Sequence, residues 1–574
     1  MSGYTITSER IDDVPLVMAW LEKMQVAALI DANLPKPHGN RQGVSYGELT
    51  VLYLTYLLTE CNHFLSPVQE WAEQRKECLA QLLGAPLRPT DCTDDRLQDL
   101  LDVMGEQASA REKIEMQMGQ HLIRAYALPT KTARIDTTTV SVYHQPEDQS
   151  LLTFGHSKDH RPDLRQFKEA LGTLDPVGIP LCSVTLKGSC ADDPVYVPVW
   201  RQMVKIVGHA DFLCVGDCKM AALQTRATLQ KEGGCYLAPV PMTGETPALL
   251  KQLLPHGADT VEDIVVFAGT PQQVRVGAGF EVSLQRTHTD PTTKQIFSWS
   301  ERTLVMCSDK LRERHQQHLR QHLQRAEQAL LELNAKPQTD PVRLQKQCQA
   351  LLKRFEMQDY LSVSYTNQIQ QTKRYLKRGR HKDDTPFEML TTTLWQVEVL
   401  RQEEALTDAY ATAGWRLFVT NAAPEQLSLQ ETAACYREQW QPEHGFHRIK
   451  GGSLAVRPLL LRSDGRIRGL MFFLMLALRF LCLFEFVVRR SLQDQTQGLA
   501  GLYAGNPKRL TFQPTTERLL SAFDGITLYR TQNADTVFWQ VTLLSDLQRR
   551  ILHLAGLPET VYDLHNMAAQ LPFT

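Results

Sequence analysis

The chain of 574 residues carries 62 lysines and arginines against 64 acidic residues, and its formal net charge at pH 7 is −2. Hydrophobic residues make up 43% of it and charged residues 22%, a composition that excludes wholesale disorder. The chain is longer than a domain built around a single hydrophobic core, so we expect three or more structural units. The near-neutral balance excludes a uniformly basic coat for nucleic acid.

The charges are nevertheless segregated along the chain. Residues 1–130 contain 11 basic and 18 acidic side chains. Residues 309–382 contain 16 basic and 7 acidic side chains, and residues 441–550 contain 15 and 8. An acidic front followed by two basic blocks predicts that a polyanion binds part of the surface only.

The sequence favours a cytoplasmic protein without membrane contact. Residues 1–15 carry acids and no apolar run, unlike a secretory signal. The twelve cysteines include no Cys-x-x-Cys pair, which favours a reducing compartment. The most apolar stretch, 470–488, is interrupted by Arg479 and Glu485, whereas a membrane span needs about 20 apolar residues. We therefore predict that this stretch is a helix buried in a large core.

Residues 1–130 are predicted to form an all-helical domain that binds DNA ends or dimerises. Ser45 followed by Glu48 is a capping box before the apolar stretch 49–58. Asp94 and Asp95 lie where acids favour the start of another helix.

From residue 131 the apolar period changes from that of helices to that of strands. β-branched residues alternate over 132–143, and a turn at 175–178 separates two further candidate strands. The predicted strands cover 132–143, 150–154, 167–173, 180–186 and 210–215, with a helix over 194–207. This order predicts a mixed α/β sheet for residues 131–240.

Residues 241–413 are predicted to be an insertion into that α/β domain. β-like segments within 261–300 precede long, basic helices over 309–355 and a dense basic run at 373–382. Residues 415–420 return to a buried-strand pattern, so the α/β domain resumes over 414–495. The remaining residues, 496–574, are predicted to be a helical region.

A second capping box, Ser428 with Glu431, predicts one helix that runs to Lys450 and ends at Gly451. On such a helix Tyr436, Glu443 and Lys450, spaced seven apart, project from one face. A carboxylate flanked by a lysine suits a metal ligand with a phosphate-binding neighbour. The alternative is an ordinary solvated helix face.

Two acids occupy positions where strands disfavour them. Asp136 lies within the β-branched run 135–142, and Asp217 ends a second apolar strand. Carboxylates from neighbouring strands repel each other in one cleft unless a divalent cation lies between them. Hard oxygen ligands favour Mg²⁺ or Mn²⁺. The alternative is that Asp136 faces solvent and Asp217 caps a helix beginning near Lys219.

Taken together, these residues resemble the DDE transposases of bacterial insertion sequences. The family's signature is Tyr, two residues, Arg, three residues, Glu, six residues and Lys. Here Tyr436, Glu443 and Lys450 match it, while Gln439 occupies the Arg position and Pro442 precedes the glutamate. The runs 93–97, 155–164 and 547–552 are also similar to the branch called insertion-sequence family 1634.

The resemblance implies a fold, a mechanism and a set of DNA contacts. The fold is an RNase H-like catalytic domain, a mixed five-stranded sheet with helices, interrupted by a large insertion. Two Mg²⁺ ions, for which Mn²⁺ can substitute, are held by Asp136, Asp217 and Glu443 and serve DNA cleavage and strand transfer. The residues expected to contact DNA are Tyr436, Lys450, Lys158, His160, Arg161 and Arg448.

The partners implied are double-stranded DNA, at the terminal inverted repeats of a transposon and at a target, and a second copy of the chain in a homodimer. A bacterial, nucleoid-associated location follows from them. Two alternatives stay open at this point. One is a structure-selective nuclease on the RNase H-like fold, and the other is an inactive, domesticated DNA-binding protein, which Gln439 and Pro442 favour.

Overall fold

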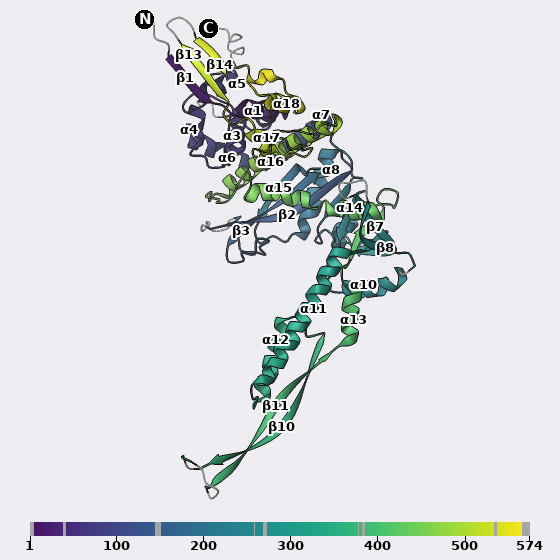
Figure 1. Cartoon of the computed structure of the whole chain (residues 1–574). Coiled ribbons are helices and arrows are strands. Elements are labelled where there is room, and N and C mark those ends of the chain that lie inside the picture. The colour runs from purple at the N-terminus through teal and green to yellow at the C-terminus, as the bar shows by residue number, and fades with distance from the viewer. Residues whose placement is uncertain are drawn as a thin grey trace.

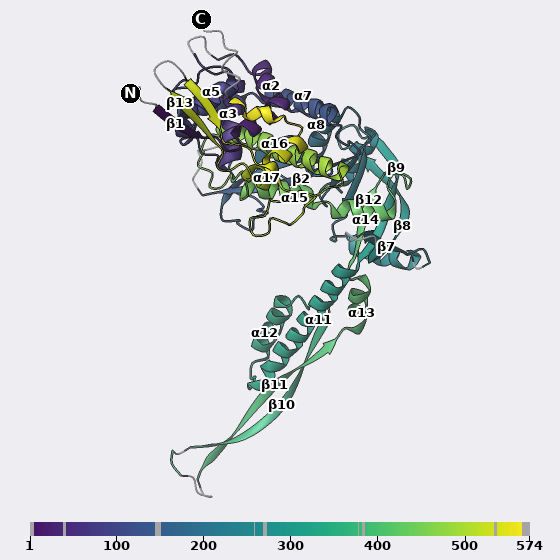
Figure 2. The same ribbon diagram turned by 45° about the horizontal axis from the view of Figure 1, so that its top comes forward.

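The computed structural model describes residues 5–37, 42–143, 151–257, 259–267, 273–376, 378–380, 385–532 and 537–564. The molecule is elongated, with a body of helices and sheet from which a narrow arm extends (Figures 1 and 2). The arm is built from the middle of the chain and lies at the opposite end of the molecule from the first strand.

A nine-stranded mixed sheet runs through the body. Its strands are β2 (Thr132–Val142), β3 (Arg165–Leu174), β4 (Ile179–Lys187), β5 (Leu213–Gly216), β6 (Cys235–Pro239), β7 (Glu262–Phe267), β8 (Gln273–Thr289), β9 (Ile296–Ser308) and β12 (Trp415–Thr420). Their spatial order is β4-β3-β2-β5-β6-β12-β9-β8-β7. β5 is parallel to β2 and to β6, and the other neighbours are antiparallel.

The strands predicted at 132–143, 167–173, 180–186 and 210–215 are confirmed, but the expectation of a five-stranded sheet is wrong. β9 pairs with β12 along the whole length of β12, and β8 and β7 follow. These insertion strands continue the sheet because β12 would otherwise offer an unpaired edge. The strand predicted at 150–154 is also absent from the described part: Ser150 lies outside it, and Thr153 makes one isolated bridge with Gln166.

Helices cover both faces of this sheet. They are α8 (Tyr196–Val207), preceded by η1 (Asp193–Val195), α9 (Leu223–Lys231), α10 (Thr246–Leu253), followed by η2 (Leu254–Gly257), α14 (Leu429–Arg437), α15 (Trp440–Lys450) and α16 (Asp464–Asp494). α15 packs on β2 and α16 on β4, on the side that bears Asp136, whose cross-strand partner is Leu171. A side chain on Gly445 of α15 would meet Leu171, so this helix lies directly over the strands.

The helical front predicted for residues 1–130 is confirmed, with one strand added. The elements are β1 (Thr5–Arg10), α1 (Val14–Lys23), α2 (Val26–Asn33), α3 (Tyr46–Glu60), α4 (Val68–Glu73), α5 (Lys76–Leu83), α6 (Asp94–Glu106) and α7 (Ala108–Tyr126). The Ser45–Glu48 capping box at the start of α3 is present in full.

α16 is the axis of the largest hydrophobic core. Its window of highest hydropathy is entirely buried, and it is the one helix in the described part of the chain that is long and apolar enough to cross a membrane. Arg479 and Glu485, which interrupt the apolar run, are buried as well. Arg479 donates to the carbonyls of Pro180 and Leu181. The prediction of a buried core helix is confirmed.

α6 and α16 approach backbone to backbone. A Cβ at Gly469 would lie 2.2 Å from the carbonyl oxygen of Leu101, and one at Gly105 would lie 1.9 Å from that of Gly465. Glycine is therefore required on each side of the crossing, because no side chain fits between the two helices.

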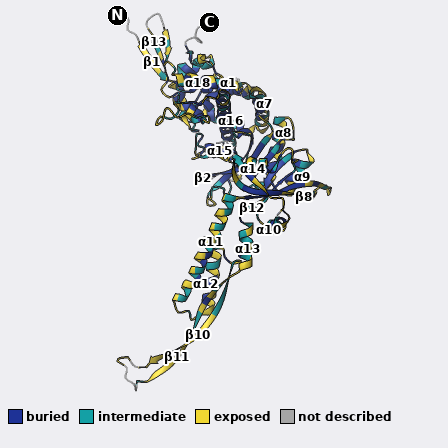
Figure 3. Ribbon diagram, turned by 45° about the vertical axis from the view of Figure 1, so that its right-hand side comes forward, coloured by how far each residue is buried: buried dark blue, intermediate teal, exposed yellow. Residues whose placement is uncertain are grey.

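The arm consists of two long helices and a hairpin. α11 (Asp309–Glu332), η3 (Leu333–Ala335) and α12 (Pro341–Arg354) confirm the predicted basic helices, and α13 (Glu403–Thr412) returns the chain to the body. The hairpin, β10 (Leu361–Tyr375) with β11 (Phe387–Arg401), was not predicted. Its base packs on the helices, while its distal half is exposed (Figure 3).

The last part of the chain is only partly helical, so the expected helical region is corrected. It contains α17 (Thr516–Ser521), α18 (Asp546–Leu554), η4 (Glu559–Tyr562) and two strands, β13 (Thr527–Gln532) and β14 (Val537–Val541). β13 pairs with β1 over the full length of both strands, so the first strand of the chain stabilises this hairpin as a three-stranded sheet.

Candidate active site

Asp136 lies in the middle of β2 with its side chain 14% exposed. Its Oδ1 accepts a hydrogen bond of 2.7 Å from the amide of Thr137, and the Nζ of Lys158 lies 3.6 Å away. Burial raises the pKa of this carboxyl to about 6, and the nearby charges of Asp217 and Glu443 raise it further, while Lys158 and the Thr137 amide oppose the rise. Asp136 therefore does not simply face solvent.

Asp217 lies level with Asp136 on the neighbouring strand. β2 and β5 are parallel, and Ile135 pairs with Gly216, so the residues that follow these two occupy the same level of the sheet. The phenol of Tyr196, on α8, donates to Asp217 Oδ1 at 2.5 Å, and the amide of Lys219 donates to the same oxygen at 2.8 Å. Asp217 thus closes a local turn and does not cap a helix, since the next helix, α9, begins at Leu223; its charge also acts on Asp136.

Glu443 is exposed in the first turn of a helix that begins just before it, and its charge acts on Asp136. The structure contains two helices, α14 and α15, where one continuous helix was predicted. The expectation that Tyr436, Glu443 and Lys450 share one helix is therefore wrong for Tyr436, while Glu443 and Lys450, seven residues apart, do lie on one helix, α15. α14 ends before Glu438, and α15 begins after Gln439. Pro442 therefore lies in the first turn of α15. A proline there removes no helical hydrogen bond, since the first amides of a helix have no partner within it.

Tyr436, in the last turn of α14, lies beside the acids. Its ring packs edge-on against Phe418 of β12, with the ring centroids 4.8 Å apart. Burial raises the pKa of Tyr436 to about 12, and the charges of Asp217 and Glu443 add to the effect. Tyr436 and Glu443 therefore belong to two different helices but remain close enough for the charge of Glu443 to act on Tyr436.

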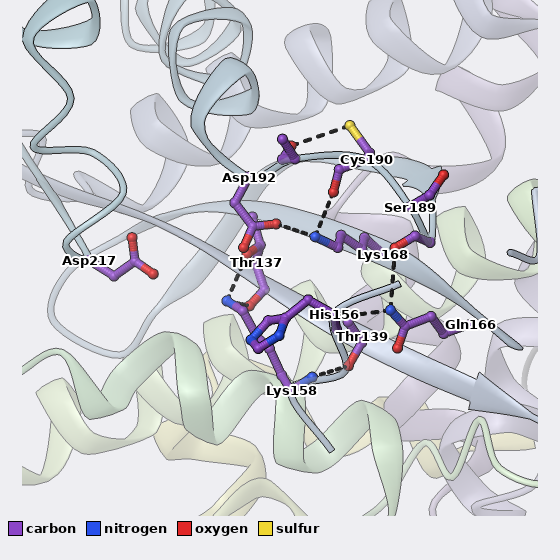
Figure 4. Close-up of polar contacts among 12 residues, drawn as sticks. Thr137, Thr139, His156, Lys158, Gln166, Lys168, Ser189, Cys190, Asp192 and Asp217 are labelled. Atoms are coloured by element: carbon purple, nitrogen blue, oxygen red, sulfur yellow. Dashed lines mark hydrogen bonds and ion pairs between the residues drawn. The ribbon is translucent and has the colours of Figure 1, made fainter. Parts of the chain in front are cut away.

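Lys158 and Lys450 are both held by side-chain or backbone oxygens. Lys158 donates to the carbonyl oxygen and the hydroxyl of Thr137, as Figure 4 shows beside Asp217. The Nζ of Lys450 donates to Asp159 at 2.7 Å, and burial lowers the pKa of this lysine. Asp159 lies in the same loop as Lys158, so this loop carries one lysine and fixes the other.

The other residues expected to contact DNA divide into exposed and buried ones. His160 and Arg161 are exposed at the tip of that loop, and Arg161 pairs with Asp163. Arg448 is 3% exposed and pairs with Glu485 and Glu517. The expectation that Arg448 contacts DNA is therefore wrong: it lies on the face of α15 that packs on α16.

The structure adds neighbours that the sequence did not reveal. Tyr196 begins α8, which is separated from β2 in the chain by β3, β4 and η1, and only the fold brings its hydroxyl to Asp217. Lys168 and Asp192 form a pair at 2.7 Å close to Thr137 (Figure 4), and the charge of Asp192 acts on Tyr196 together with those of Asp136 and Asp217. The three consecutive threonines at 137–139, directly after Asp136, are the sequence feature that could have indicated a polar cleft.

The donor set fits a hard divalent cation by its chemistry. The charges of Asp217 and Glu443 act on Asp136, whose pKa burial raises to about 6, and a cation beside these oxygen ligands would favour the ionised form of Asp136. Within the described ranges, no three His, Cys, Asp or Glu side chains are gathered closely enough to form a ready-made metal site. Lys158 supplies the positive charge beside Asp136 in this structure.

Comparison with known proteins gives one family match that covers most of this region. The family described as "Transposase DDE domain" matches residues 129–480, which include Asp136, Asp217 and Glu443. No curated protein sequence matches the chain. A solved structure of a piggyBac transposase synaptic complex with hairpin DNA is similar at 12% identity and a TM-score of 0.24, over 50% of this chain and 60% of that one. At that score the two folds are not shown to be alike.

Proposed function

Because the chain belongs to the transposase DDE domain family, we propose that it cleaves DNA at the ends of a mobile element and joins the freed 3′-hydroxyl to target DNA. The proposal assigns the catalytic acids to Asp136, Asp217 and Glu443. The observation that carries it is that Asp136 and Asp217 lie level on neighbouring parallel strands and that the charges of Asp217 and of Glu443, on α15, both act on Asp136. Carboxyl ends of parallel strands are where α/β sheets place their binding sites.

We propose that Asp136, Asp217 and Glu443 hold two Mg²⁺ ions, with Mn²⁺ as a substitute. When bound, such ions activate the attacking oxygen and stabilise the leaving oxygen of a phosphodiester. Tyr196 orients Asp217 by donating to Oδ1, which leaves the second carboxylate oxygen available as a ligand. Lys158 neutralises part of the negative charge at Asp136, which would otherwise oppose the approach of a DNA phosphate.

The order of the first five catalytic strands supports an RNase H-like core. β4, β3 and β2 are consecutive antiparallel neighbours, and β5 and β6 follow on the far side of β2 in parallel. The insertion then extends this core with β7, β8 and β9 before β12 returns. We therefore assign residues 131–240 and 414–495 to one catalytic domain and residues 241–413 to its insertion.

The arm is the part of the protein that we assign to DNA at a distance from the acids. Its distal half is exposed and carries the described basic side chains Lys373, Arg374, Arg378 and Arg380. One described acid, Glu388, lies opposite Arg374. A two-stranded ribbon fits the major groove of DNA, and cations on it bind by displacing counterions from phosphates. Exposed His160 and Arg161, with Tyr436 and Lys450, are assigned to DNA near the acids.

A cleavage assay tests the proposal. The substrate is DNA that ends in the inverted repeats flanking the gene. Asp217→Asn should abolish Mg²⁺-dependent cleavage and leave DNA binding largely intact, while Asp546→Asn, which removes an exposed acid paired with Arg549, should leave both intact. Undiminished cleavage by Asp217→Asn rejects the assignment. Cleavage without joining in a strand-transfer assay identifies a nuclease, and binding without metal-dependent turnover identifies an inactive DNA-binding protein.

A location on the bacterial nucleoid and a homodimer on DNA complete the proposal. A dimer is tested by measuring the mass of the protein–DNA complex in solution. A 1:1 complex that still cleaves would remove the dimer from the proposal and leave the assignment of the acids untouched.

A further inference from the structure

The position where the family signature has an arginine is occupied by Gln439, and this residue contacts a guanidinium from elsewhere in the chain. Gln439 is the N-cap of α15, directly after the break that follows α14. Its Oε1 accepts a hydrogen bond of 3.2 Å from Nη1 of Arg134. The helix thus lacks the arginine of the signature at residue 439, and the guanidinium of Arg134, from β2, lies beside that residue instead.

Arg134 lies two residues before Asp136 and on the same face of β2, because strand residues two apart point to the same side. Its side chain is completely buried. Nε and Nη2 donate to the two carboxylate oxygens of Asp175, at 2.7 and 2.8 Å, in the turn between β3 and β4. This bidentate pair holds the guanidinium plane in one orientation.

The remaining donors of Arg134 go to the junction between the two helices. Nη2 donates to the carbonyl oxygen of Cys435 at 3.0 Å, and Nη1 donates to Gln439. Cys435 lies in the last turn of α14, where a helix leaves carbonyls without helical partners and favours a positive charge. One side chain therefore connects β2, the β3–β4 turn, the end of α14 and the start of α15.

The two ends of this connection carry the candidate acids. Asp136 follows Arg134 on β2, and Glu443 follows Gln439 by one helical turn on α15. Tyr436 is the neighbour of Cys435. A shift of the α14–α15 junction relative to β2 would therefore move Glu443 and Tyr436 together away from Asp136.

We propose that Arg134 is a positioning residue, which holds the helix bearing Glu443 in register with the strand bearing Asp136, and that Gln439 is retained as its acceptor. The role rests on the proposed function of the acids. A guanidinium only donates hydrogen bonds, so its partner at residue 439 must accept one. An arginine at 439 would place a second guanidinium beside the buried one of Arg134, although it would restore the signature of the family.

The proposal and the family signature taken alone predict opposite cleavage rates for variants at Arg134 and Gln439. Arg134→Gln should lower the cleavage rate about 10- to 100-fold, as small misplacements of catalytic groups do, and should raise the Mg²⁺ concentration needed for half-maximal rate. Gln439→Arg alone should also be impaired. The exchange Arg134→Gln with Gln439→Arg should recover at least part of the rate, because it restores one guanidinium and one acceptor at the junction.

Arg226→Gln is the matched control. Arg226 is 8% exposed and forms a separate buried ion pair with Glu301, so its loss reports the general effect of breaking such a pair. A purely structural loss reduces the amount of active protein and leaves the Mg²⁺ dependence unchanged. If Arg134→Gln behaves like Arg226→Gln in rate and Mg²⁺ dependence, or if Gln439→Arg cleaves as fast as the unaltered protein, the proposal is overturned.

Hydrogen exchange gives a readout that does not require activity. The backbone amides of residues 435–441 and of Glu443 should exchange at least tenfold faster in Arg134→Gln than in the unaltered protein, and Arg226→Gln should leave them unchanged. If the unaltered protein shows no metal-dependent cleavage, the proposed function fails, and this measurement still decides on Arg134. Unchanged exchange in Arg134→Gln overturns the positioning role whether or not the protein cleaves DNA.

Discussion

Replacing Asp136 with asparagine is expected to stabilise the metal-free protein while removing its activity. Burial, with the charges of Asp217 and Glu443, raises the pKa of this carboxyl from its ordinary 3.8 to about 6. In the unfolded chain the proton is lost near the ordinary pKa, whereas the folded protein keeps it to higher pH. Stability therefore falls as the pH rises through this window, and the loss is complete above the folded-state pKa.

The size of the effect follows from the two pKa values. A rise from 3.8 to about 6 corresponds to about 3 kcal/mol at pH 8 and to about half of that at pH 5. Asparagine keeps an oxygen that can accept from the Thr137 amide, and it carries no charge to desolvate. Asp136→Asn should therefore raise the free energy of unfolding by up to about 3 kcal/mol at pH 8, with a smaller gain at pH 5.

Urea unfolding followed by circular dichroism, in the presence of a chelator, measures this difference. Mg²⁺ at about 100 times its dissociation constant should stabilise the unaltered protein by about 2.7 kcal/mol, and this increment should be lost in Asp136→Asn. Asp163→Asn serves as the control and should show no stabilisation, since Asp163 is exposed. A variant less stable than the unaltered protein at pH 8, or a difference independent of pH, would refute the reasoning.

Three further expectations test other parts of the structure. Tyr196→Phe removes the donor to Asp217, a hydrogen bond to a charged group worth about 1.5–3 kcal/mol, so single-turnover cleavage should slow about 10- to 100-fold; an unchanged rate would show that Asp217 needs no such partner. Gly469→Ala places a Cβ 2.2 Å from the Leu101 carbonyl and should cost about 1–3 kcal/mol in urea unfolding, while Gly505→Ala, which meets nothing within 4 Å, should be nearly neutral. Exchanging the basic side chains of the arm for glutamine should reduce the steepness of a plot of log affinity against log salt concentration, by about 0.9 for each phosphate that the arm no longer neutralises. The exposed Lys251→Gln serves as control. An unchanged slope would exclude the arm from DNA binding. The arm residues to change are Lys373, Arg374, Arg378 and Arg380.

The sequence was most informative where a local rule decides the structure. Both N-terminal capping boxes form as predicted, because Ser45 and Ser428 satisfy amides within their own first turns. Asp136 and Asp217 stand out because acids interrupt apolar strands, and the parallel register then brings them level. These features depend on residues close together in the chain.

What the sequence did not reveal depends on contacts between distant segments. The break before α15 arises where Arg134 binds Cys435 and Gln439, about 300 positions away in the chain, and no periodicity reports such a contact. The local sequence around Arg448 does not indicate that this residue is buried, because its partner Glu485 comes from another helix, α16. The hairpin of the arm is rich in Gln and Thr, so its strands lack the alternation of a half-buried sheet.

The position of α16 after the front helices, the strands β2 to β6 and the arm has a consequence for how the protein is made. Synthesis proceeds from the N-terminus, so the helices of the front and the strands β2 to β6 leave the ribosome long before the helix on which both pack. Glu443 also emerges only after the whole arm. A nascent or prematurely terminated chain therefore carries Asp136 and Asp217 without their third partner and without a closed core. Under the proposed function, cutting activity becomes available only after Glu443 and α16 have been synthesised, which spares the DNA near a growing chain.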